Sequence, residues 1–400
     1  MYRLTTAIQN YAWGSATAIP SLLGLEPDGA PVAEAWFGAH ASAPSHCVTA
    51  DGEPGVPMTE VIAADAEAVL GEHVRARFGP ALPYLLKLIA AEQPLSLQVH
   101  PHVDAARAGY DDEESRGVPR DAPHRSYRDR NHKPELVYAL TRFEALCGFR
   151  APRRAAELLD GLGSTLADEL RTVLASQPTA RGIEEAFTRL LRPETRPSAA
   201  EVDEVVAACA ARLEAGSPSA RADRTVVRLG AAYPGDPGVV TSLLLNPVTL
   251  QPGEALFVPA GGVHAYLQGL GVEIMASSDN VLRAGLTPKH VDVDELLRNV
   301  DYVAAPPIRI APERFYGATR VYYAPVDDFE LSVTRVEDGQ THPLPGRGPR
   351  ILLCIEGRMV VSSRDDGEIE LTRGTAAFAP ATDGPLSVRG AGTLVQADVP

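Results

Sequence analysis

The chain has 400 residues, of which 45% are hydrophobic and 22% charged, and its formal net charge is −15 at pH 7. This length exceeds one ordinary hydrophobic core, so we expect two or three domains. The negative charge argues against nucleic acid or an anionic membrane as a partner.

No run of about 18 apolar residues occurs, so no transmembrane helix is predicted. Met1 to Ser15 has no signal-peptide pattern. The four cysteines lie far apart without a C-x-x-C pair, which is typical of a reducing compartment. We therefore expect a cytoplasmic protein, and the sequence leaves open whether it is a monomer or a homodimer.

Residues 1–150 contain short apolar runs that are broken by Gly, Pro and Asp. Val32–Phe37, Leu82–Ile89 and Leu95–Val99 are predicted strands. Residues 151–222 differ sharply, because they are rich in Ala, Leu, Glu and Arg. Ser198 to Glu201 reads as a capping box. One helical stripe follows it: Val202, Val205, Val206, Cys209 and Leu213.

From Thr225 onwards the pattern again favours strands, at Thr225–Leu229, Val239–Leu245, Ala255–Pro259 and Gly271–Met275. Asp292–Val300 is a predicted helix, and Ala304–Pro307 reads as a linker. The remainder shows Gly and Pro turns between short strands, which favours a sandwich or barrel. Its predicted strands are Val321–Tyr323, Phe329–Val336, Ile351–Ile355, Met359–Ser362 and Ala376–Pro380.

This reading divides the chain into three parts. The first combines residues 1–150 with residues 223–303, the second is a helical insert at 151–222, and the third is residues 308–400. A weak internal repeat links the first and third parts, because Gly253–Pro259 and Gly374–Pro380 share the frame G-x5-P with Phe at the same offset. Gly261 and His264 follow only the first copy.

Four polar residues could close on one divalent ion. Gln98 and His100 alternate with apolar residues, so on a strand both would face the same side. Glu135 and His264 complete the set, and the glycine-rich frame before His264 resembles the second metal motif of the cupin jelly rolls. Two imidazoles, a carboxylate and an amide oxygen suit zinc, although manganese and cobalt stay open. Any one of these histidines taken alone is more often structural.

At these residues the chain resembles type I mannose-6-phosphate isomerases, also called phosphomannose isomerases. The motifs lie in the family's order across roughly residues 1–300. They are Tyr11–Gly14, Glu34–His40, Gln93–Pro101, Tyr127–Glu135, Pro259–Tyr266 and Ser278–Lys289. The chain departs from the family's pattern after Pro101, where His102 and Val103 stand in place of Asn or Asp and Lys.

The resemblance implies a mainly β fold of two cupin-type jelly-roll barrels with an inserted α-helical subdomain, and a C-terminal barrel without a metal site. It implies one Zn²⁺ per chain, held by Gln98, His100, Glu135 and His264. The implied reaction interconverts mannose 6-phosphate and fructose 6-phosphate, which serves mannose breakdown or GDP-mannose synthesis. The phosphorylated hexose is then the main partner of the protein.

Aldose–ketose isomerisation through a cis-enediol needs a base, a group that polarises the sugar oxygens, and a clamp for the phosphate. The resemblance implies that Arg283 is essential, and its guanidinium can grip phosphate or polarise an oxygen. Lys133 could stabilise negative charge beside the metal. Glu273 and Asp279 are the candidate bases, and the sequence does not choose between them, nor between proton and hydride transfer.

The remaining candidates have auxiliary roles. Tyr266 should share a strand face with His264 and could hydrogen-bond the sugar, and His132 could act as a proton shuttle. Ser96, Lys87 and Lys289 could complete a phosphate site.

Two other functions stay open at this point. The first is another metal-dependent cupin enzyme, such as an iron oxygenase or an epimerase, although Gln98 and the cations Lys133 and Arg283 argue against an oxygenase site. The second is a non-catalytic bicupin that binds a ligand or a protein.

Overall fold

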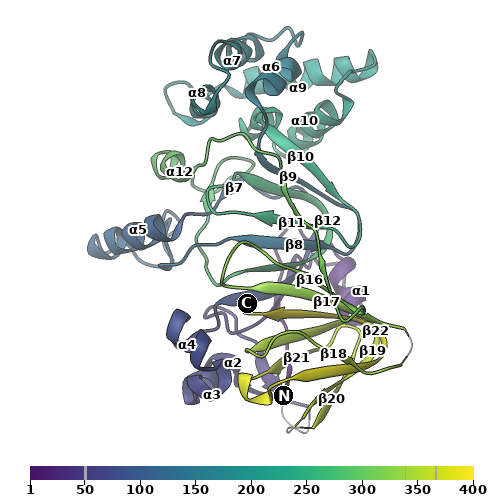
Figure 1. Cartoon of the computed structure of the whole chain (residues 1–400). Coiled ribbons are helices and arrows are strands. Elements are labelled where there is room, and N and C mark those ends of the chain that lie inside the picture. Colours follow the sequence, from purple (N-terminus) through teal and green to yellow (C-terminus); the bar gives the residue numbers. More distant parts are fainter. Residues whose placement is uncertain (49–51, 338, 365–366) are drawn as a thin grey trace.

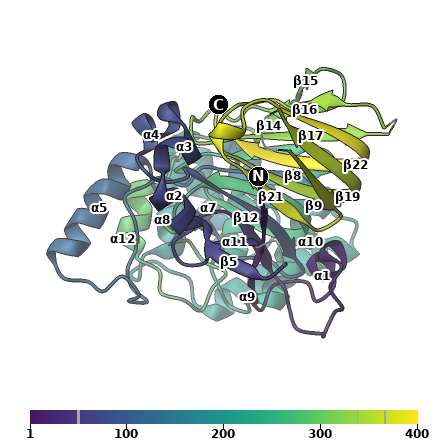
Figure 2. The same ribbon diagram turned by 90° about the horizontal axis from the view of Figure 1, so that it is seen from below.

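The computed structural model describes residues 1–48, 52–337, 339–364 and 367–400. The protein is mainly β, with two large antiparallel sheets stacked along the long axis of the molecule and a group of helices at one end (Figure 1). Seen along that axis, the second sheet covers one side of the molecule (Figure 2). None of the helices in the described ranges is long and apolar enough to cross a membrane.

The first sheet carries the metal motifs, and its main strand order is β14-β11-β8-β12-β6-β3-β2. Its long central strand β12 pairs with β6 and β8 through its second half and with β7 and β9 through its first half. The strands are β2 (Ala7–Gln9), β3 (Glu34–Phe37), β6 (Tyr84–Ala91), β7 (Gln98–Val99), β8 (Glu135–Ala139), β9 (Phe143–Phe149), β10 (Leu245–Leu250), β11 (Ala255–Val258), β12 (His264–Ala276), β13 (Leu282–Arg283) and β14 (Ile308–Ile310).

The second sheet has the order β15-β16-β17-β22-β19-β21-β1-β4-β5, with β18 and β20 attached at its side. Here the predicted strands Ile351–Ile355 and Met359–Ser362 form one long strand, β19. The strands are β1 (Tyr2–Leu4), β4 (His46–Val48), β5 (Pro54–Pro57), β15 (Glu313–Phe315), β16 (Thr319–Tyr322), β17 (Glu330–Val336), β18 (His342–Pro343), β19 (Arg350–Ser363), β20 (Glu368–Thr372), β21 (Ala376–Ala379) and β22 (Leu386–Asp398).

Each of the two sheets includes one strand from the other end of the chain. Strand β1, at the N-terminus, pairs with β21 in the second sheet, whereas β14 pairs with β11 in the first sheet. The predicted G-x5-P repeat fits this pattern, because Gly253 and Gly374 have φ values of 91° and 86° and precede β11 and β21. Each glycine therefore makes a turn that a side chain would strain. The division into three parts stays a prediction, and two pairings cross its boundaries.

Helices occupy most of the chain between β9 and β10. The predicted capping box is confirmed, because Ser198 and Glu201 cap α9 reciprocally, and the predicted stripe is buried at Val202, Val205 and Cys209. These helices are α6 (Pro152–Leu159), α7 (Thr165–Ser176), α8 (Ala180–Leu191), α9 (Ala199–Glu214), α10 (Ala220–Ala232), α11 (Gly238–Thr241) and a 3-10 turn (Ser242–Leu244).

Two strand predictions in this region are wrong. Thr225–Leu229 lies inside α10, where Val226 and Leu229 are buried one helical turn apart against the neighbouring helices. Most of Val239–Leu245 lies in α11 and the 3-10 turn. Short apolar runs do not distinguish a buried helix from a strand, and tertiary packing decided the outcome here.

The other helices are confirmed or new. The prediction at 292–300 is confirmed, because Asp292 caps α12. The others are α1 (Ala18–Leu23), α2 (Met58–Ala64), α3 (Ala66–Leu70), α4 (Glu72–Phe78), α5 (Val103–Ser115) and α12 (Val293–Asn299).

One hydrophobic core joins the two sheets. It includes Leu86 and Phe257 of the first sheet together with Phe329 and Phe378 of the C-terminal part of the chain, residues 308–400, all at most 2% exposed. Tyr322 of β16 adds a hydrogen bond from its hydroxyl to the Gly253 carbonyl, at 2.9 Å. The second sheet is therefore packed into the structure that carries the metal motifs.

A truncated chain that ends after residue 311 would keep β14 but lose its share of this core. We expect it to be insoluble, because the apolar face of the first sheet would be exposed to water. Expression and sedimentation of the truncated chain beside the full chain would check this. A soluble, fully active truncated chain would show that the second sheet is an accessory.

Asp398 predicts a pH dependence of stability. Burial raises its pKa to about 8, so the folded state keeps a proton that the unfolded state releases above pH 4. The folded state therefore loses stability between about pH 4 and 8. We expect Asp398→Asn, which cannot ionise, to be more stable at pH 7 by on the order of 2 to 4 kcal/mol.

Urea unfolding of both chains at pH 5 and pH 8 would measure the effect of Asp398→Asn. An equal difference between variant and wild type at the two pH values would contradict the raised pKa.

Candidate functional site

Four chain segments converge at the ends of β7, β8 and β12. His264 is the first residue of β12, and its Cα pairs with that of Gln98 on β7. On the other side Gln98 pairs with Arg283 of β13. Glu135 begins β8. Strand pairing thus brings together residues that are separated by more than one hundred positions in sequence.

Three of the predicted ligands surround one buried point. His100 Nε2 lies 3.1 Å from Glu135 Oε1, and His264 Nε2 lies 3.4 Å from Glu135 Oε2. The three side chains are at most 4% exposed, and their ligand atoms all lie within 4.8 Å of one another. Within the described part of the chain this is the only such group of His, Cys, Asp and Glu.

The hydrogen bonds of the two imidazoles leave their Nε2 lone pairs free. His100 Nδ1 donates to the Asn280 carbonyl at 2.8 Å, and His264 Nδ1 donates to the Gly262 carbonyl at 3.0 Å. Each Nε2 then carries a lone pair that faces the Glu135 carboxylate. Among the described residues, His100 Nε2 has no hydrogen-bond partner of good geometry.

These residues fit a divalent cation. Two lone pairs pointed at a carboxylate repel it unless a positive charge lies among them. Burial lowers the pKa of His100 to about 4, so protonation of its ring does not supply that charge near neutral pH. Burial alone would raise the pKa of Glu135, but positive charge at this point, from the His100 ring whenever it is protonated and from Lys133, lowers that pKa well below the usual value. Neutral imidazoles beside an ionised carboxylate are the ligand set that zinc takes.

The fourth predicted ligand stands beside this group. Gln98 is half-buried, and its side-chain amide donates to Ser96 Oγ at 3.4 Å. This contact uses the nitrogen and leaves the amide oxygen available, and the pairing of Gln98 with His264 places it at the same strand ends. Ligation by Gln98 stays a prediction.

Lys133 and Tyr266 also contact Glu135. Lys133 Nζ lies 3.3 Å from Oε1, and the Tyr266 hydroxyl donates to Oε2 at 3.3 Å. Burial raises the pKa of Tyr266 well above 10, and the carboxylates of Glu273 and Glu135 add to this, so the phenol stays protonated. The phenol of Tyr266 therefore offers a proton at the edge of the candidate metal centre, where Lys133 contacts the same carboxylate.

Glu273 is a buried carboxylate close to Glu135 and Tyr266. Burial raises its pKa to about 6, while the Lys87 ammonium, 3.3 Å away, opposes that shift. A pKa near neutrality suits a general base. Lys87 also lies 3.8 Å from Glu34 and over the ring of Trp36. Burial would lower the pKa of Lys87, but the carboxylates of Glu34 and Glu273 raise it.

Lys87 is thus held between two acids at 4% exposure. This geometry suits the positioning of Glu273 and gives no support to the predicted phosphate contact, which stays a prediction.

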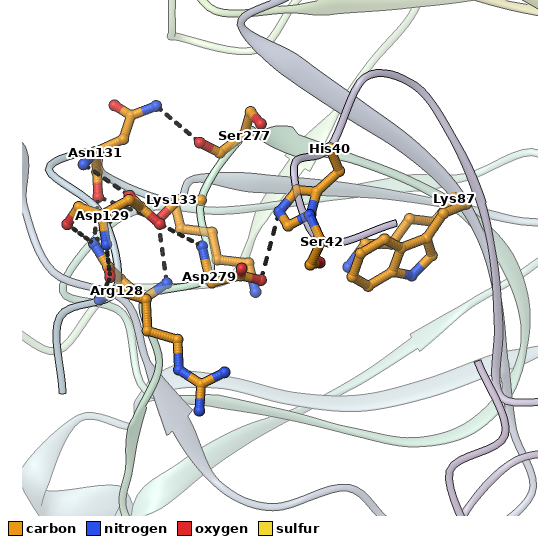
Figure 3. A network of polar contacts seen from close by, with 12 residues as sticks. His40, Ser42, Lys87, Arg128, Asp129, Asn131, Lys133, Ser277 and Asp279 are labelled. Carbon is orange, nitrogen blue, oxygen red and sulfur yellow. Dashed lines mark hydrogen bonds and ion pairs between the residues drawn. The ribbon is translucent and has the colours of Figure 1, made fainter. Parts of the chain in front are cut away.

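Asp279 belongs to a polar network that sequence reasoning left unassigned (Figure 3). Its carboxylate lies 3.5 Å from His40 Nε2, and its backbone N–H donates to Asp129 at 2.7 Å. Burial lowers the pKa of His40. The motif Glu34–His40 contained the signal, since four of its side chains are polar or aromatic, but no spacing rule connects it with position 279.

Asn280 joins the two motif segments that carry the site. Its side chain accepts hydrogen bonds from the backbone of Arg128 and Asp129 and donates to carbonyls of Asp129 and Asn131. Its own carbonyl receives the His100 bond. The fully buried amide therefore fixes the backbone that leads to Lys133 and Glu135.

Three cationic side chains lie close enough together to affect one another: Arg283, Arg128 and Lys289. Burial lowers the pKa of Arg283, and the neighbouring Arg128 lowers it further. Burial, then Arg283 and Arg128, likewise lower the pKa of Lys289, which is exposed. The guanidinium of Arg128 projects away from the network in Figure 3. Like charges that depress one another's pKa favour an anion between them.

The ring of His132 makes its contact with the C-terminal part of the chain. Its Nε2 lies 3.0 Å and 3.1 Å from the two carboxylate oxygens of Asp328, in the turn between β16 and β17. The predicted proton shuttle, His132, therefore has its partner in the C-terminal part of the chain, residues 308–400. Its role in chemistry stays a prediction.

Known proteins identify the family of this chain. The sequence profile described as phosphomannose isomerase type I, catalytic domain, matches residues 1–152, and the mannose-6-phosphate isomerase cupin domain matches residues 319–399. Mannose-6-phosphate isomerase of Escherichia coli is 39% identical over 99% of both chains. The chain belongs to the type I phosphomannose isomerase family.

More distant members and solved structures agree with this family assignment. Mannose-6-phosphate isomerase of Homo sapiens is 31% identical over 96% of this chain and 94% of the human protein. A glutamate-to-alanine variant of phosphomannose isomerase from Salmonella typhimurium superposes with a TM-score of 0.89 at 38% identity, over 99% and 98% of the two chains. A zinc-bound mannose 6-phosphate isomerase superposes with a TM-score of 0.87 at 38% identity over the same shares.

Removal of the Glu135 carboxylate, which faces both His100 and His264, should abolish metal binding. We expect Glu135→Gln to lower zinc affinity at least about 100-fold, because the buried anion is the charge that balances the cation. Zinc content after dialysis against a graded chelator series would measure the effect. His73→Ala, which alters an exposed histidine on α4, serves as the control. Unchanged zinc retention in Glu135→Gln would place the metal elsewhere.

Proposed function

We propose that the protein interconverts D-mannose 6-phosphate and D-fructose 6-phosphate, with one Zn²⁺ held by Gln98, His100, Glu135 and His264. The observation that carries this proposal is the buried set of two imidazoles that face one carboxylate, next to Lys133 and Tyr266. The family supports the same reaction, since its members named above are mannose-6-phosphate isomerases.

The bound zinc would supply a positive charge that polarises the sugar oxygens as negative charge develops on them. The chain's own residues would do the proton work. Glu273, with a pKa raised to about 6 by burial, and Asp279, whose carboxylate lies 3.5 Å from His40 Nε2, are the two candidate bases. Lys133 and Tyr266 would stabilise the oxyanion of a cis-enediol by donating hydrogen bonds to it.

Binding of the remote phosphate would orient the reacting end of the sugar. Arg283 and Lys289 suit this task, because both lie among like charges that an anion would relieve. Ser96 offers a hydroxyl beside Gln98. This local cluster is needed because the net charge of −15 repels an anionic substrate at longer range.

We further propose that each sheet forms a cupin-type jelly roll, and that residues 151–222 form a helical subdomain inserted into the first. The second barrel would hold no metal. In the repeat, Val258 pairs with Glu135, whereas the corresponding Ala379 pairs with Arg350. A buried guanidinium thus stands at the place of the metal-binding carboxylate.

The reaction can be tested by following fructose 6-phosphate formation from mannose 6-phosphate. We expect activity to disappear with a chelator and to return when zinc is added. Failure of activity with every divalent metal would overturn the proposed function.

Arg283→Ala should separate substrate binding from metal binding. We expect turnover to fall roughly 100-fold or more with zinc content unchanged, because the guanidinium would bind the substrate and is not among the proposed metal ligands. Steady-state kinetics with metal analysis would measure both quantities, and Arg154→Ala, at an exposed position on α6, is the matched control. Normal activity of Arg283→Ala would remove this arginine from the mechanism.

A further inference from the structure

The C-terminal part of the chain, residues 308–400, contacts the segment that carries Lys133 and Glu135 through one buried carboxylate, that of Asp328. Asp328 presents both of its oxygens to His132 Nε2, at 3.0 and 3.1 Å. The side chain of Asp328 is 8% exposed and that of His132 is 25% exposed. This pair joins positions 196 residues apart and lies one residue before Lys133.

Asp328 is held in place by the residues that follow it. Phe329 is fully buried in the core that joins the two sheets, and Glu330 begins β17. The hairpin of β16 and β17 lies on the side of the second sheet that faces β8 (Figure 1). The carboxylate is therefore fixed before any substrate arrives.

The contact determines which nitrogen of His132 carries the proton. A carboxylate accepts a hydrogen bond, so in this contact a proton lies on Nε2, and Nδ1 is the nitrogen that Asp328 leaves unbonded. No described residue hydrogen-bonds Nδ1. The backbone of His132 is fixed as well, because its N–H donates to Asn131 Oδ1 at 3.0 Å. The ring thus has a defined orientation, and its Nδ1 makes no hydrogen bond with a described residue.

We propose that Asp328 is a positioning residue of the active site, supplied by the C-terminal part of the chain, residues 308–400. It orients the imidazole of His132 and keeps a proton on Nε2, so that Nδ1 is left as the nitrogen through which His132 would relay a proton. The same division of labour between carboxylate and imidazole occurs in catalytic triads and around metal-bound histidines. The inference rests on the proposed isomerase function.

Adjacent aspartates give a matched pair of variants. Asp328→Ala should lower kcat about 10- to 100-fold and leave KM within about threefold, because it affects proton transfer and no substrate contact. Asp327→Ala removes an exposed ion pair at the neighbouring position and should leave kcat within about twofold. Asp328→Asn retains an acceptor oxygen without the charge and should lie between Asp328→Ala and the wild type.

A double-mutant cycle separates positioning from general stability. His132→Ala should lower kcat at least as much as Asp328→Ala. If Asp328 acts through His132, adding Asp328→Ala to His132→Ala should change kcat by no more than about twofold. Full additivity of the two losses would overturn the proposal, as would wild-type kcat in Asp328→Ala.

A spectroscopic measurement tests the placement independently of activity. ¹⁵N NMR of the full chain, with the His132→Ala spectrum as the assignment, should show Nε2 protonated in wild type and in Asp327→Ala. In Asp328→Ala this preference should be lost. A wild-type chain without isomerase activity would refute the proposed function alone, whereas an unchanged His132 tautomer in Asp328→Ala would refute the role of Asp328.

Discussion

The structure of the site depends on one buried negative charge, the carboxylate of Glu135. An ionised carboxylate away from water is strongly unfavourable unless other groups compensate it. Here two imidazoles, an ammonium and a phenol lie within 3.4 Å of its two oxygens. Because the imidazoles direct lone pairs at it, the arrangement is complete only with a cation present. The preference for a metal follows from electrostatics as much as from ligand identity.

The carboxylate needs a rigid surrounding, and the two sheets supply it together. The central strand β12 begins at His264 and passes Glu273, so it carries both a metal ligand and a candidate base. The second sheet buttresses the first through a shared apolar core, β1 pairs with β21 in the second sheet, and β14 pairs with β11 in the first. The second sheet, in which Arg350 stands at the place that Glu135 has in the first, also supplies the Asp328 contact to His132.

Around the centre, acids and bases occur in pairs whose members tune one another. Lys87 lies between Glu273 and Glu34, Asp279 faces His40, and Asp328 faces His132. Only the cations near Arg283 lack such partners in the contacts described above. The site therefore has a neutralised interior and a positive rim, which is the distribution of charge that a phosphorylated sugar requires.

The sequence by itself pointed to the candidate ligands and to the family. Strand alternation singled out His100, the glycine frame singled out His264, and the polar cluster that ends at Glu135 supplied the carboxylate, while the ordered motifs pointed to one enzyme family. The capping box of α9 was predictable because its hydrogen bonds lie within four residues. Local chemistry of this kind is written in adjacent positions.

Only the tertiary structure decided the rest. Thr225–Leu229 became helical because packing against other helices outweighed a short β-like pattern. The partners of Lys87, Asp279 and His132 come from distant segments, and no spacing rule connects residue 132 with residue 328. The exchange of β1 and β14 between sheets is equally invisible, because a strand's sequence specifies which face is apolar and leaves its neighbour to be chosen by the packing of the whole chain.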